Sequence, residues 1–460
     1  MIDISNRKKI NIRDKKVTVI GLGTSGTAAA ILANHLGARV FGSDSSENFQ
    51  ISNNALYLLN NHIASETGLH SKRIYDADLW IISPGVPNDT DIVKKAQNRG
   101  IPIVGEIEFA SWYTDSPIVA VTGSNGKTTT VNILSEMCQS ENVQSIMAGN
   151  MGIPFSERVL TEIKKPKQNL AYILEISSFQ MEFVLHFCPK IAVYTNLSPD
   201  HLDRHGTMDE YVNTKLKMVK NMGSDGYIVF NADDPQLIMA LEGHDSKLAP
   251  FSMMRTGLIY SIDSKNINTI TGNSLLSVND IALPGKHNLS NMLCAATSSS
   301  LMGISDKHIA NVMKTFTGVE HRLENVAIIK DVTYINDSKA TNLDSVSVAI
   351  QSFNKPVVLI LGGRNKGADF RLLLPHIKSS HVRDIISYGE AGGQISTAIG
   401  DAVRSVQVTD LNSAVTTAQR LAAPGDVVLL SPGCASFDQF ANFEERGQYF
   451  KTKVMEMMAA

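Results

Sequence analysis

The sequence has few cysteines and no long hydrophobic run. Four cysteines are spread over 460 residues without a CxxC pair, so neither a disulfide framework nor a structural zinc site is expected. No apolar stretch approaches the ~18 residues of a membrane-spanning helix, and residues 1–16 are polar and lack the apolar core of a signal peptide. We therefore expect a cytoplasmic protein without membrane insertion.

A large excess of one charge is also absent. Lys and Arg number 42 and Asp and Glu number 45, which gives a formal net charge of −3. This balance argues against a protein that binds nucleic acids or membrane surfaces through bulk positive charge. Hydrophobic residues make up 43% of the chain, enough for large buried cores, and the length corresponds to about three domains of roughly 150 residues each.

Short apolar runs rich in β-branched residues recur along the chain, and most lead into a stretch with helical character. Continuous apolar runs are typical of parallel strands covered on both faces by helices, and the alternation of strand and helix indicates an α/β fold. The runs are Val17–Ile20, Leu79–Ile82, Ile118–Val121, Tyr172–Ile176, Ile191–Tyr194, Thr333–Asn336, Pro356–Leu361, Asp384–Tyr388 and Val427–Leu430.

Boundaries between three α/β domains are predicted near Gly105 and Gly318. They divide the chain into residues 1–105, 106–318 and 319–460. Within the central domain, residues 247–284 are interrupted by glycines. This pattern predicts short hairpin strands, that is, a small antiparallel insert.

A glycine-rich turn follows the first apolar run. Residues 21–26, Gly-Leu-Gly-Thr-Ser-Gly, match GxGxxG, and Asp44 follows about 20 residues later, as in dinucleotide-binding folds. Glycines let the backbone approach a pyrophosphate, the helix start supplies N–H donors, and Asp44 could accept bonds from ribose hydroxyls. The pattern fits any nucleotide diphosphate. NAD or FAD, and a tight turn without a ligand, remain alternatives. A second turn at residues 83–85, Ser-Pro-Gly, could line the same crevice.

A sharper phosphate-binding motif follows the run Ile118–Val121. Residues 122–130 read Thr-Gly-Ser-Asn-Gly-Lys-Thr-Thr-Thr, in which backbone N–H groups can cradle phosphates, Lys127 can reach the β- and γ-oxygens and Thr128 can bind Mg²⁺. The usual eight-residue motif has glycine where this chain has Val121. The motif is therefore a variant P-loop, and it predicts an ATP site.

Candidate metal ligands follow two further apolar runs. Glu175 lies at the end of an apolar run, where burying a carboxylate costs free energy unless the group is paired or bound to metal. Asp200, His201 and Asp203 follow the run Ile191–Tyr194. Near the P-loop, these side chains are candidates to hold the metal that accompanies ATP. The helical stretch after them carries Lys215 and Lys217, which spacing alone would assign to a solvated face.

Together these motifs resemble those of the Mur ligase family, the ATP-dependent amide ligases of peptidoglycan precursor synthesis. The resemblance extends from about Val17 to Phe450, nearly the whole chain. The P-loop is joined, in the order of the family's motifs, by Ala148–Gly152, Glu175–Gln180, Asp200–Asp203, Gly285–Asn288, His321–Arg322, Asp337–Asn342 and Leu361–Lys366.

The segment Leu430–Gly447 resembles the D-glutamate-adding member of this family. The resemblance implies that ATP phosphorylates the terminal carboxylate of UDP-N-acetylmuramoyl-L-alanine to an acyl phosphate, that the amine of D-glutamate attacks it, and that phosphate leaves. It also implies a Rossmann-like UDP-binding domain, a central P-loop ATPase-like domain and a Rossmann-like C-terminal domain that binds D-glutamate. We expect a monomer that acts on these small molecules without nucleic acid or membrane partners.

The resemblance also assigns roles by matching position. Lys127, Glu175, His201 and Lys215 would be catalytic. Two Mg²⁺ ions would be held by Thr128, Glu175, His201 and a carbamate formed from CO₂ on Lys215. Carbamylation needs a neutral amine, which implies a lowered pKa, and the spacing from Tyr211 favours Lys215 over Lys217.

The remaining assignments concern the three substrates. ATP would contact Gly123, Ser124, Asn125, Gly126, Lys127, Thr128, Thr129, Asn288, Arg322 and Asp337. The UDP-sugar would contact Thr24, Ser25, Asp44, Ser83, Gly85, Asn150 and His201, although the residues that touch uracil are left open. D-Glutamate would contact Lys339, Thr341, Lys366, Ser436 and Phe443.

Three alternatives remain at this point. A folate polyglutamate ligase has a similar P-loop but does not explain the two N-terminal turns or the segment Leu430–Gly447. An NAD-dependent oxidoreductase would explain GxGxxG but leaves the P-loop, Glu175 and His201 unexplained. A catalytically inactive binding protein is disfavoured because every motif lysine is present.

Overall fold

The computed structural model describes residues 2, 4–6, 10–140, 142–199, 202–263, 265–365 and 367–459, with residues 202, 203, 344 and 459 described by their backbone alone. Two compact units are present, Met1–Phe316 and Thr317–Ala460, and each is described by itself. Within the described residues, no helix combines the length and the apolar character needed to cross a bilayer.

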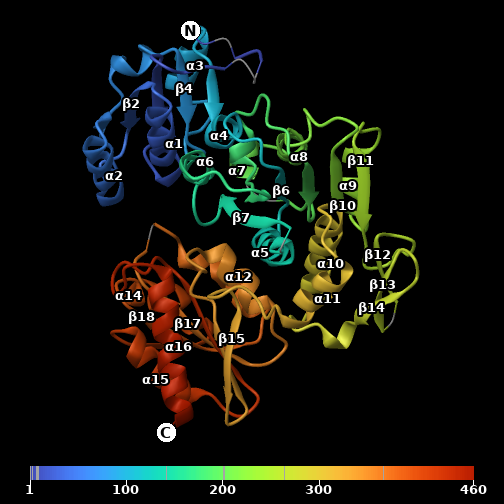
Figure 1. Ribbon diagram of the computed structural model, residues 1–460. Coiled ribbons are helices and arrows are strands. Elements are labelled where there is room, and N and C mark those ends of the chain that lie inside the picture. Colours follow the sequence, from blue (N-terminus) through green and yellow to red (C-terminus); the bar gives the residue numbers. More distant parts are fainter. Residues whose placement is uncertain are drawn as a thin grey trace. The chain divides into compact units, whose positions relative to one another are not determined.

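The N-terminal sheet of the first unit is fully parallel, in the strand order β3-β2-β1-β4-β5 (Figure 1). Its central strands are almost completely buried because helices cover them, as their continuous apolar sequences predict. The strands are β1 (Lys16–Ile20), β2 (Arg39–Asp44), β3 (Ala64–Thr67), β4 (Leu79–Ile82) and β5 (Ile103–Gly105), and the helices are α1 (Thr24–His35), α2 (Phe49–Asn60), η2 (Lys72–Tyr75), α3 (Asp91–Asn98) and α4 (Glu106–Ser111).

The second sheet of this unit has six parallel strands in the order β11-β10-β9-β6-β8-β7. Its strands are β6 (Ile118–Thr122), β7 (Gln144–Gly149), β8 (Leu170–Glu175), β9 (Ile191–Tyr194), β10 (Tyr227–Asn231) and β11 (Lys247–Phe251). Its helices are α5 (Lys127–Cys138), α6 (Phe155–Lys164), η3 (Phe179–Met181), α7 (Leu202–His205), α8 (Met208–Leu216), α9 (Pro235–Leu241), α10 (Lys286–Leu301) and α11 (Asp306–Thr315).

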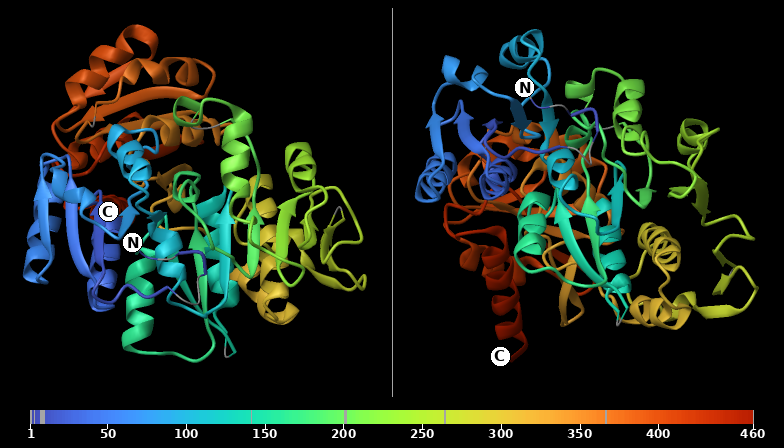
Figure 2. Two further views of the ribbon diagram at one scale, coloured as in Figure 1. Left: turned by 90° about the horizontal axis from the view of Figure 1, so that it is seen from above. Right: turned by 45° about the horizontal axis from the view of Figure 1, so that its top comes forward.

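The region expected to form only an antiparallel insert has two parts. Its first segment, β11, pairs in parallel with β10 as the edge strand of the six-stranded sheet, and an edge position tolerates Pro250 because proline lacks an N–H to donate. The remainder does form a small antiparallel sheet beside α10 and α11 (Figures 1 and 2). It contains β12 (Tyr260–Ile262), β13 (Asn266–Thr269), β14 (Ser274–Ser277) and η4 (Val278–Asp280).

The second unit holds a six-stranded sheet in the order β15-β16-β20-β17-β18-β19, parallel except for the edge strand β15. Its strands are β15 (Glu324–Ile329), β16 (Val332–Asn336), β17 (Val357–Gly362), β18 (Val382–Tyr388), β19 (Arg404–Gln407) and β20 (Val427–Gly433), and its helices are α12 (Leu343–Gln351), η5 (Phe370–Leu373), α13 (Leu374–Lys378), α14 (Gly392–Ile399), η6 (Gly400–Ala402), α15 (Leu411–Leu421) and α16 (Phe443–Ala459). The predicted α/β class is confirmed.

Candidate active site

The P-loop connects β6 to the first turn of α5. Gly123 and Gly126 have φ angles of 144° and 82°, a region that favours glycine. A side chain on Gly123 would collide with Thr195 Oγ1, and one on Gly126 would collide with Asn291 Oδ1. Both glycines are therefore required for the loop to pass this close to its neighbours. Thr128 and Thr129 follow in the first turn of α5.

Residues after β9 hold the P-loop in shape. Asn125 N–H donates to Asn196 Oδ1 at 2.9 Å, and Thr195 Oγ1 donates to Asn125 O at 2.6 Å. Ser124 Oγ donates to Ser198 O at 2.8 Å. The metal ligands predicted in this segment lie outside the described residues. Its described residues fix the loop backbone, a role that the sequence did not predict.

The lysine of the P-loop folds back onto the loop itself. Lys127 Nζ donates to the carbonyl oxygens of Gly123 and Ser124, each at 2.8 Å. Its charged group therefore lies over the loop whose N–H groups would cradle phosphates. A bound phosphate would be a stronger partner for the ammonium group than these neutral carbonyls.

Glu175 joins the P-loop to the end of β7. Its side chain is 3% exposed. Thr128 Oγ1 donates to Oε2 at 2.7 Å, and Asn150 Nδ2 donates to Oε1 at 2.9 Å. One buried carboxylate thus contacts both the hydroxyl assigned to Mg²⁺ and the amide assigned to the acceptor substrate. From the sequence, Thr128 and Glu175 are predicted to bind Mg²⁺, and Asn150 is predicted to contact the UDP-sugar.

Lys215 lies beside the P-loop, on α8. Its side chain is 2% exposed, its Nζ donates to Gly123 O at 3.1 Å and to Thr122 Oγ1 at 3.3 Å, and it lies 4.6 Å from the centre of the Tyr211 ring. Lys217 instead donates to the carbonyl of Glu182 at 3.2 Å. Burial lowers the pKa of Lys217. Of the two lysines, Lys215 is the one hydrogen-bonded to the P-loop.

The oxygen donors at the P-loop suit Mg²⁺. The hydroxyl of Thr128 and the carboxylate of Glu175 are hard ligands, and Mg²⁺ at nucleotide sites typically takes one or two carboxylates together with phosphate oxygens and water. Across the described ranges, no three or more His, Cys, Asp or Glu side chains converge as a metal cluster. Asp200, His201 and the side chain of Asp203 lie outside the description, so their assignments stay predictions.

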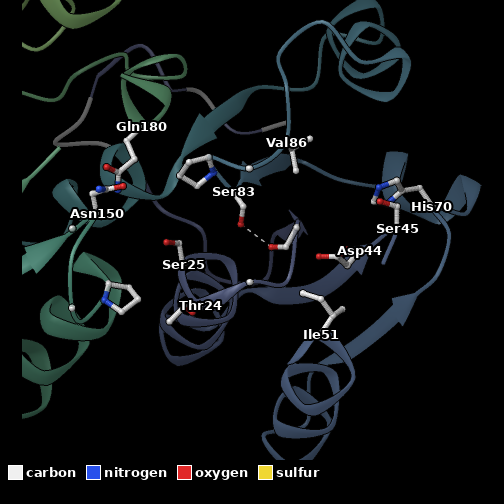
Figure 3. A pocket seen from close by; sticks show the side chains of 17 residues that line it. Thr24, Ser25, Asp44, Ser45, Ile51, His70, Ser83, Val86, Asn150 and Gln180 are labelled. Atoms are coloured by element: carbon white, nitrogen blue, oxygen red, sulfur yellow. Dashed lines mark hydrogen bonds between the residues drawn. The ribbon is translucent and has the colours of Figure 1, made fainter. Parts of the chain in front are cut away.

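A cavity of about 560 Å³ lies at the carboxyl edge of the N-terminal sheet and extends to the end of β7 (Figure 3). All of the described residues assigned to the UDP-sugar line it. The lining residues are Gly21, Gly23, Thr24, Ser25, Asp44, Ser45, Ile51, His70, Ser83, Pro84, Gly85, Val86, Gly149, Asn150, Gly152, Pro154 and Gln180. His70, Ile51 and Pro154 had no assigned role.

The first glycine-rich turn is fixed by groups from neighbouring strands. Asp44 accepts from the N–H groups of Leu22 at 2.7 Å and Ser46 at 2.8 Å. Ser83 Oγ donates to Gly21 O at 2.8 Å, the dashed contact in Figure 3. Thr24 begins α1, so the positive end of that helix opens into the cavity. The turn thus combines accessible backbone with a helix start, the arrangement that binds phosphate groups.

In the second unit, the described residues assigned to D-glutamate lie on two loops, which share one buried cation, and at the first position of α16. Arg446 is 0% exposed. Its guanidinium donates to Ser338 Oγ and O and to Cys434 O at 2.8–3.1 Å. Lys339 Nζ is 5.9 Å from the centre of the Phe443 ring. Arg446 therefore links the loop of Lys339 and Thr341 to the loop of Ser436. Lys366 lies outside the described residues.

Asp337 is a buried carboxyl group at the end of β16. It accepts from Ser431 Oγ at 2.7 Å and from Leu323 N–H at 3.2 Å. Burial raises its pKa to about 7, against the opposing effects of these donors and of Arg322. Arg322 itself is exposed. Asn288, the other residue assigned to the nucleotide with them, belongs to the first unit, where it donates to Pro284 O at 2.7 Å.

Comparison with known proteins identifies all three parts of the chain. Family models match residues 15–105 (Mur ligase MurD-like, N-terminal domain), 121–299 (Mur ligase middle domain) and 321–434 (Mur ligase, glutamate ligase domain). Relatives from Koribacter versatilis, Salinibacter ruber and Thermoanaerobacter pseudethanolicus are 37%, 36% and 38% identical. Each match covers 97% of this chain and 99%, 99% and 100% of the relative, respectively. All three are named UDP-N-acetylmuramoylalanine–D-glutamate ligase.

Solved structures agree on the fold. UDP-N-acetylmuramate-alanine ligase MurC from Thermotoga maritima superposes with a TM-score of 0.56 at 18% identity, over 97% of this chain and 99% of that one. MurF from Acinetobacter baumannii superposes with a TM-score of 0.57 at 16% identity, over 96% and 93%. With relatives above 35% identity over nearly the full length, these findings establish that the chain belongs to the Mur ligase family.

Proposed function

We propose that this chain ligates D-glutamate to UDP-N-acetylmuramoyl-L-alanine at the expense of ATP, as a cytoplasmic and monomeric enzyme of peptidoglycan precursor synthesis. The main support is the set of near-full-length relatives that carry this name. The structural support is Glu175, which contacts both the P-loop and Asn150, a residue that lines the cavity assigned to the UDP-sugar. Joining a phosphate donor to an acceptor carboxylate requires two such sites to be adjacent.

The proposed reaction begins with the acceptor carboxylate, which is a poor electrophile. Its oxygen attacks the γ-phosphorus of ATP, the bond from that phosphorus to the bridging oxygen breaks, and ADP and an acyl phosphate form. The amine of D-glutamate then attacks the acyl carbon, and a tetrahedral intermediate forms. It collapses to the amide as phosphate leaves and the amine loses a proton. Phosphorylation thus converts a carboxylate oxygen into a good leaving group.

The chain's own residues would bring the anionic groups together. The P-loop N–H groups would bind the phosphates, and Lys127 would exchange its two carbonyl partners for phosphate oxygens. Asn150 would orient the acceptor, while Glu175 holds the side-chain amide of Asn150 in place. Mg²⁺, when bound, neutralises charge on the phosphates; Thr128 and Glu175 would hold it. A second ion, with His201 and a carbamate on Lys215 as ligands, is also part of this proposal.

The remaining assignments extend the proposal to three regions, 1–105, 106–318 and 319–460. Asn288, Arg322 and Asp337 would contact the nucleotide. Lys339, Thr341, Lys366, Ser436 and Phe443 would contact D-glutamate. The shared hydrogen bonds of Arg446 support a common role for the two loops that carry Lys339 and Ser436.

The decisive experiment measures phosphate release by the purified chain with ATP, Mg²⁺, UDP-N-acetylmuramoyl-L-alanine and D-glutamate. L-Glutamate and lysine replace D-glutamate in parallel reactions, and a folate replaces the UDP-sugar to test for a folate polyglutamate ligase. We expect phosphate release only with the UDP-sugar and D-glutamate, together with an ATP-dependent product whose mass equals the sum of both substrates less one water. Release with folate, or with L-glutamate in preference to D-glutamate, would overturn the proposal.

A further inference from the structure

The cavity follows three adjacent strand ends of the N-terminal sheet. The phosphate-binding turn follows β1, Asp44 ends β2, and His70 follows β3. Neighbouring strands are about 4.8 Å apart, so the turn and the end of β3 are separated by roughly 10 Å. A nucleotide whose diphosphate lies at the turn, with its ribose beside Asp44, therefore reaches the end of β3 with its base.

Figure 3 shows His70 and Ser45 at one end of the cavity, while Asn150 and Gln180 lie at the other. Asn150 contacts Glu175 and through it the P-loop. The reacting end of the substrate therefore belongs at the Asn150 end, and the base belongs at the His70 end.

His70 is connected to two other polar residues. Its Nδ1 lies 2.7 Å from Ser43 Oγ, and Ser43 Oγ donates to Glu66 Oε1 at 2.8 Å. Ser43 and Glu66 are direct partners in the β2–β3 ladder, and Ser43 is 0% exposed. The same Glu66 oxygen also accepts from Ser71 N–H at 2.9 Å. The contacts thus form a chain from Glu66 through Ser43 to the imidazole ring.

The hydrogen bonds that connect Glu66, Ser43 and His70 determine which nitrogen of the imidazole carries the proton. Burial would raise the pKa of Glu66, but hydrogen bonds from Ser71 and Ser43 lower it below its usual value. The ionised carboxylate can only accept, so the single hydroxyl proton of Ser43 goes to Glu66. The Ser43 oxygen must then accept from His70 Nδ1–H. Burial lowers the pKa of His70, against the attraction of Asp44 and Glu66, so the ring is neutral and its Nε2 is an acceptor.

We propose that His70 selects uracil by accepting a hydrogen bond from the base N3–H at its Nε2 atom, with Ser43 and Glu66 as positioning residues that hold the tautomer. N3–H is the only hydrogen-bond donor on the pairing edge of uracil, whereas cytosine has an acceptor at N3. An acceptor at His70 therefore matches uracil and opposes cytosine. The inference rests on the proposed function, because it takes the cavity to be the UDP-sugar site.

The test compares the affinities of UDP, CDP and N3-methyl-UDP by calorimetry at pH 7.5. For the wild type, we expect CDP and N3-methyl-UDP to bind roughly tenfold or more weakly than UDP, the effect of leaving one polar pair unmatched. His70→Ala should weaken UDP binding and bring the CDP-to-UDP ratio of dissociation constants to within about threefold. His70→Gln should do the same, because an amide can present either a donor or an acceptor. His35→Ala removes an exposed histidine of α1 outside the cavity and should keep the wild-type ratio.

A second measurement tests the tautomer directly. Nitrogen-15 NMR of labelled histidines separates the two neutral forms, and we expect the Nδ1–H form for His70 in the wild type and a mixture of forms in Ser43→Ala. Ser43→Ala should also reduce discrimination against CDP, although it leaves the ring in place. A structural role alone would lower affinity for all three nucleotides equally.

The outcomes separate this inference from the proposed function. Suppose that the protein has ligase activity. An unchanged CDP-to-UDP ratio of dissociation constants in His70→Ala, or an Nε2–H tautomer in the wild type, would then overturn only the role of His70 and not the proposed function. If the wild type bound neither UDP nor UDP-N-acetylmuramoyl-L-alanine, both proposals would be overturned.

Discussion

The buried carboxyl group of Asp337 should make the stability of the C-terminal unit depend on pH. Burial raises its pKa from 3.8 to about 7, although Ser431 and Leu323 donate hydrogen bonds to it. Between these two values, the folded protein keeps a proton that the unfolded chain has released. The unfolded state therefore binds fewer protons, and the free energy of unfolding falls as pH rises.

The size of this pH effect on stability follows from the difference between the two pKa values of Asp337, 3.8 and about 7. One pH unit corresponds to about 1.4 kcal/mol, so the interval of about three units weakens folding by about 4 kcal/mol once pH exceeds 7. This loss of folding free energy is absent below pH ~4 and has reached only part of its full value at pH 5. Asp337→Asn keeps the shape of the side chain but cannot ionise, and Ser431 can accept from its amide. The stability of this variant relative to the wild type should therefore rise by about 2–3 kcal/mol between pH 5 and pH 8.

Guanidinium denaturation of both proteins at pH 5, 6, 7 and 8 measures this difference. Because a chain of several domains need not unfold in one step, hydrogen exchange in β16 reports on the C-terminal unit separately. Asp401→Asn, which removes an exposed carboxylate from the same unit, is the matched control. If wild type and Asp337→Asn gave parallel stability curves from pH 5 to pH 8, the assigned proton on Asp337 would be refuted.

Three further predictions concern activity. Lys127→Ala should lower phosphate release by roughly 10²–10³-fold or more while unfolding as the wild type does, since the lysine acts on charge that develops during transfer; near-normal release would contradict the P-loop assignment. Lys215→Ala should lose most activity and regain part of it with acetate or formate, with Lys217→Ala as the control. An intact mass of unmodified Lys215 in active enzyme would count against a carbamate. Arg446→Met should cost about 2–6 kcal/mol of stability by leaving the buried Ser338 and Cys434 carbonyl groups without their shared donor, and should raise the KM for D-glutamate. Arg446→Lys should recover part of both effects. An unchanged KM for D-glutamate in Arg446→Met would contradict a common role of the two loops in binding D-glutamate.

The parallel sheets were predictable because their physical cause is local. A run such as Ile191–Tyr194 is apolar at every position, which only burial on both faces explains, and each residue of β9 is buried. The P-loop was predictable for the same reason, since its glycines are required by their own φ angles and by close neighbours.

The β11 strand was assigned wrongly because its sequence carries little information about its partner. Lys247–Phe251 is short, half-exposed and contains Pro250, features that suit an edge strand of any sheet. Glycines further along favoured hairpins, and these did form in β12–β14. Pairing with β10 depends on the position of the whole central sheet, which no five-residue pattern contains.

His70 was missed because its chemistry depends on strand register. Ser43, Glu66 and His70 are each unremarkable in the sequence, where a single histidine after a strand has no specific partner. Only the alignment of Ser43 with Glu66 across β2 and β3 gives the imidazole a fixed donor–acceptor pattern. Register is a property of two segments together, so it could not be predicted from either one.

The order of strands in the central sheet explains how distant motifs meet at one site. Parallel strands bring their carboxyl ends to one edge, and the sequence β9-β6-β8-β7 across the sheet differs from the order along the chain. The end of β8 therefore lies between the ends of β6 and β7, where Glu175 is opposite both Val121 and Gly149. A carboxylate at that position can contact the P-loop on one side and Asn150 on the other, as observed. Moving β8 to the sheet edge would leave every motif intact in the sequence but would remove Glu175 from its place between the P-loop and Asn150.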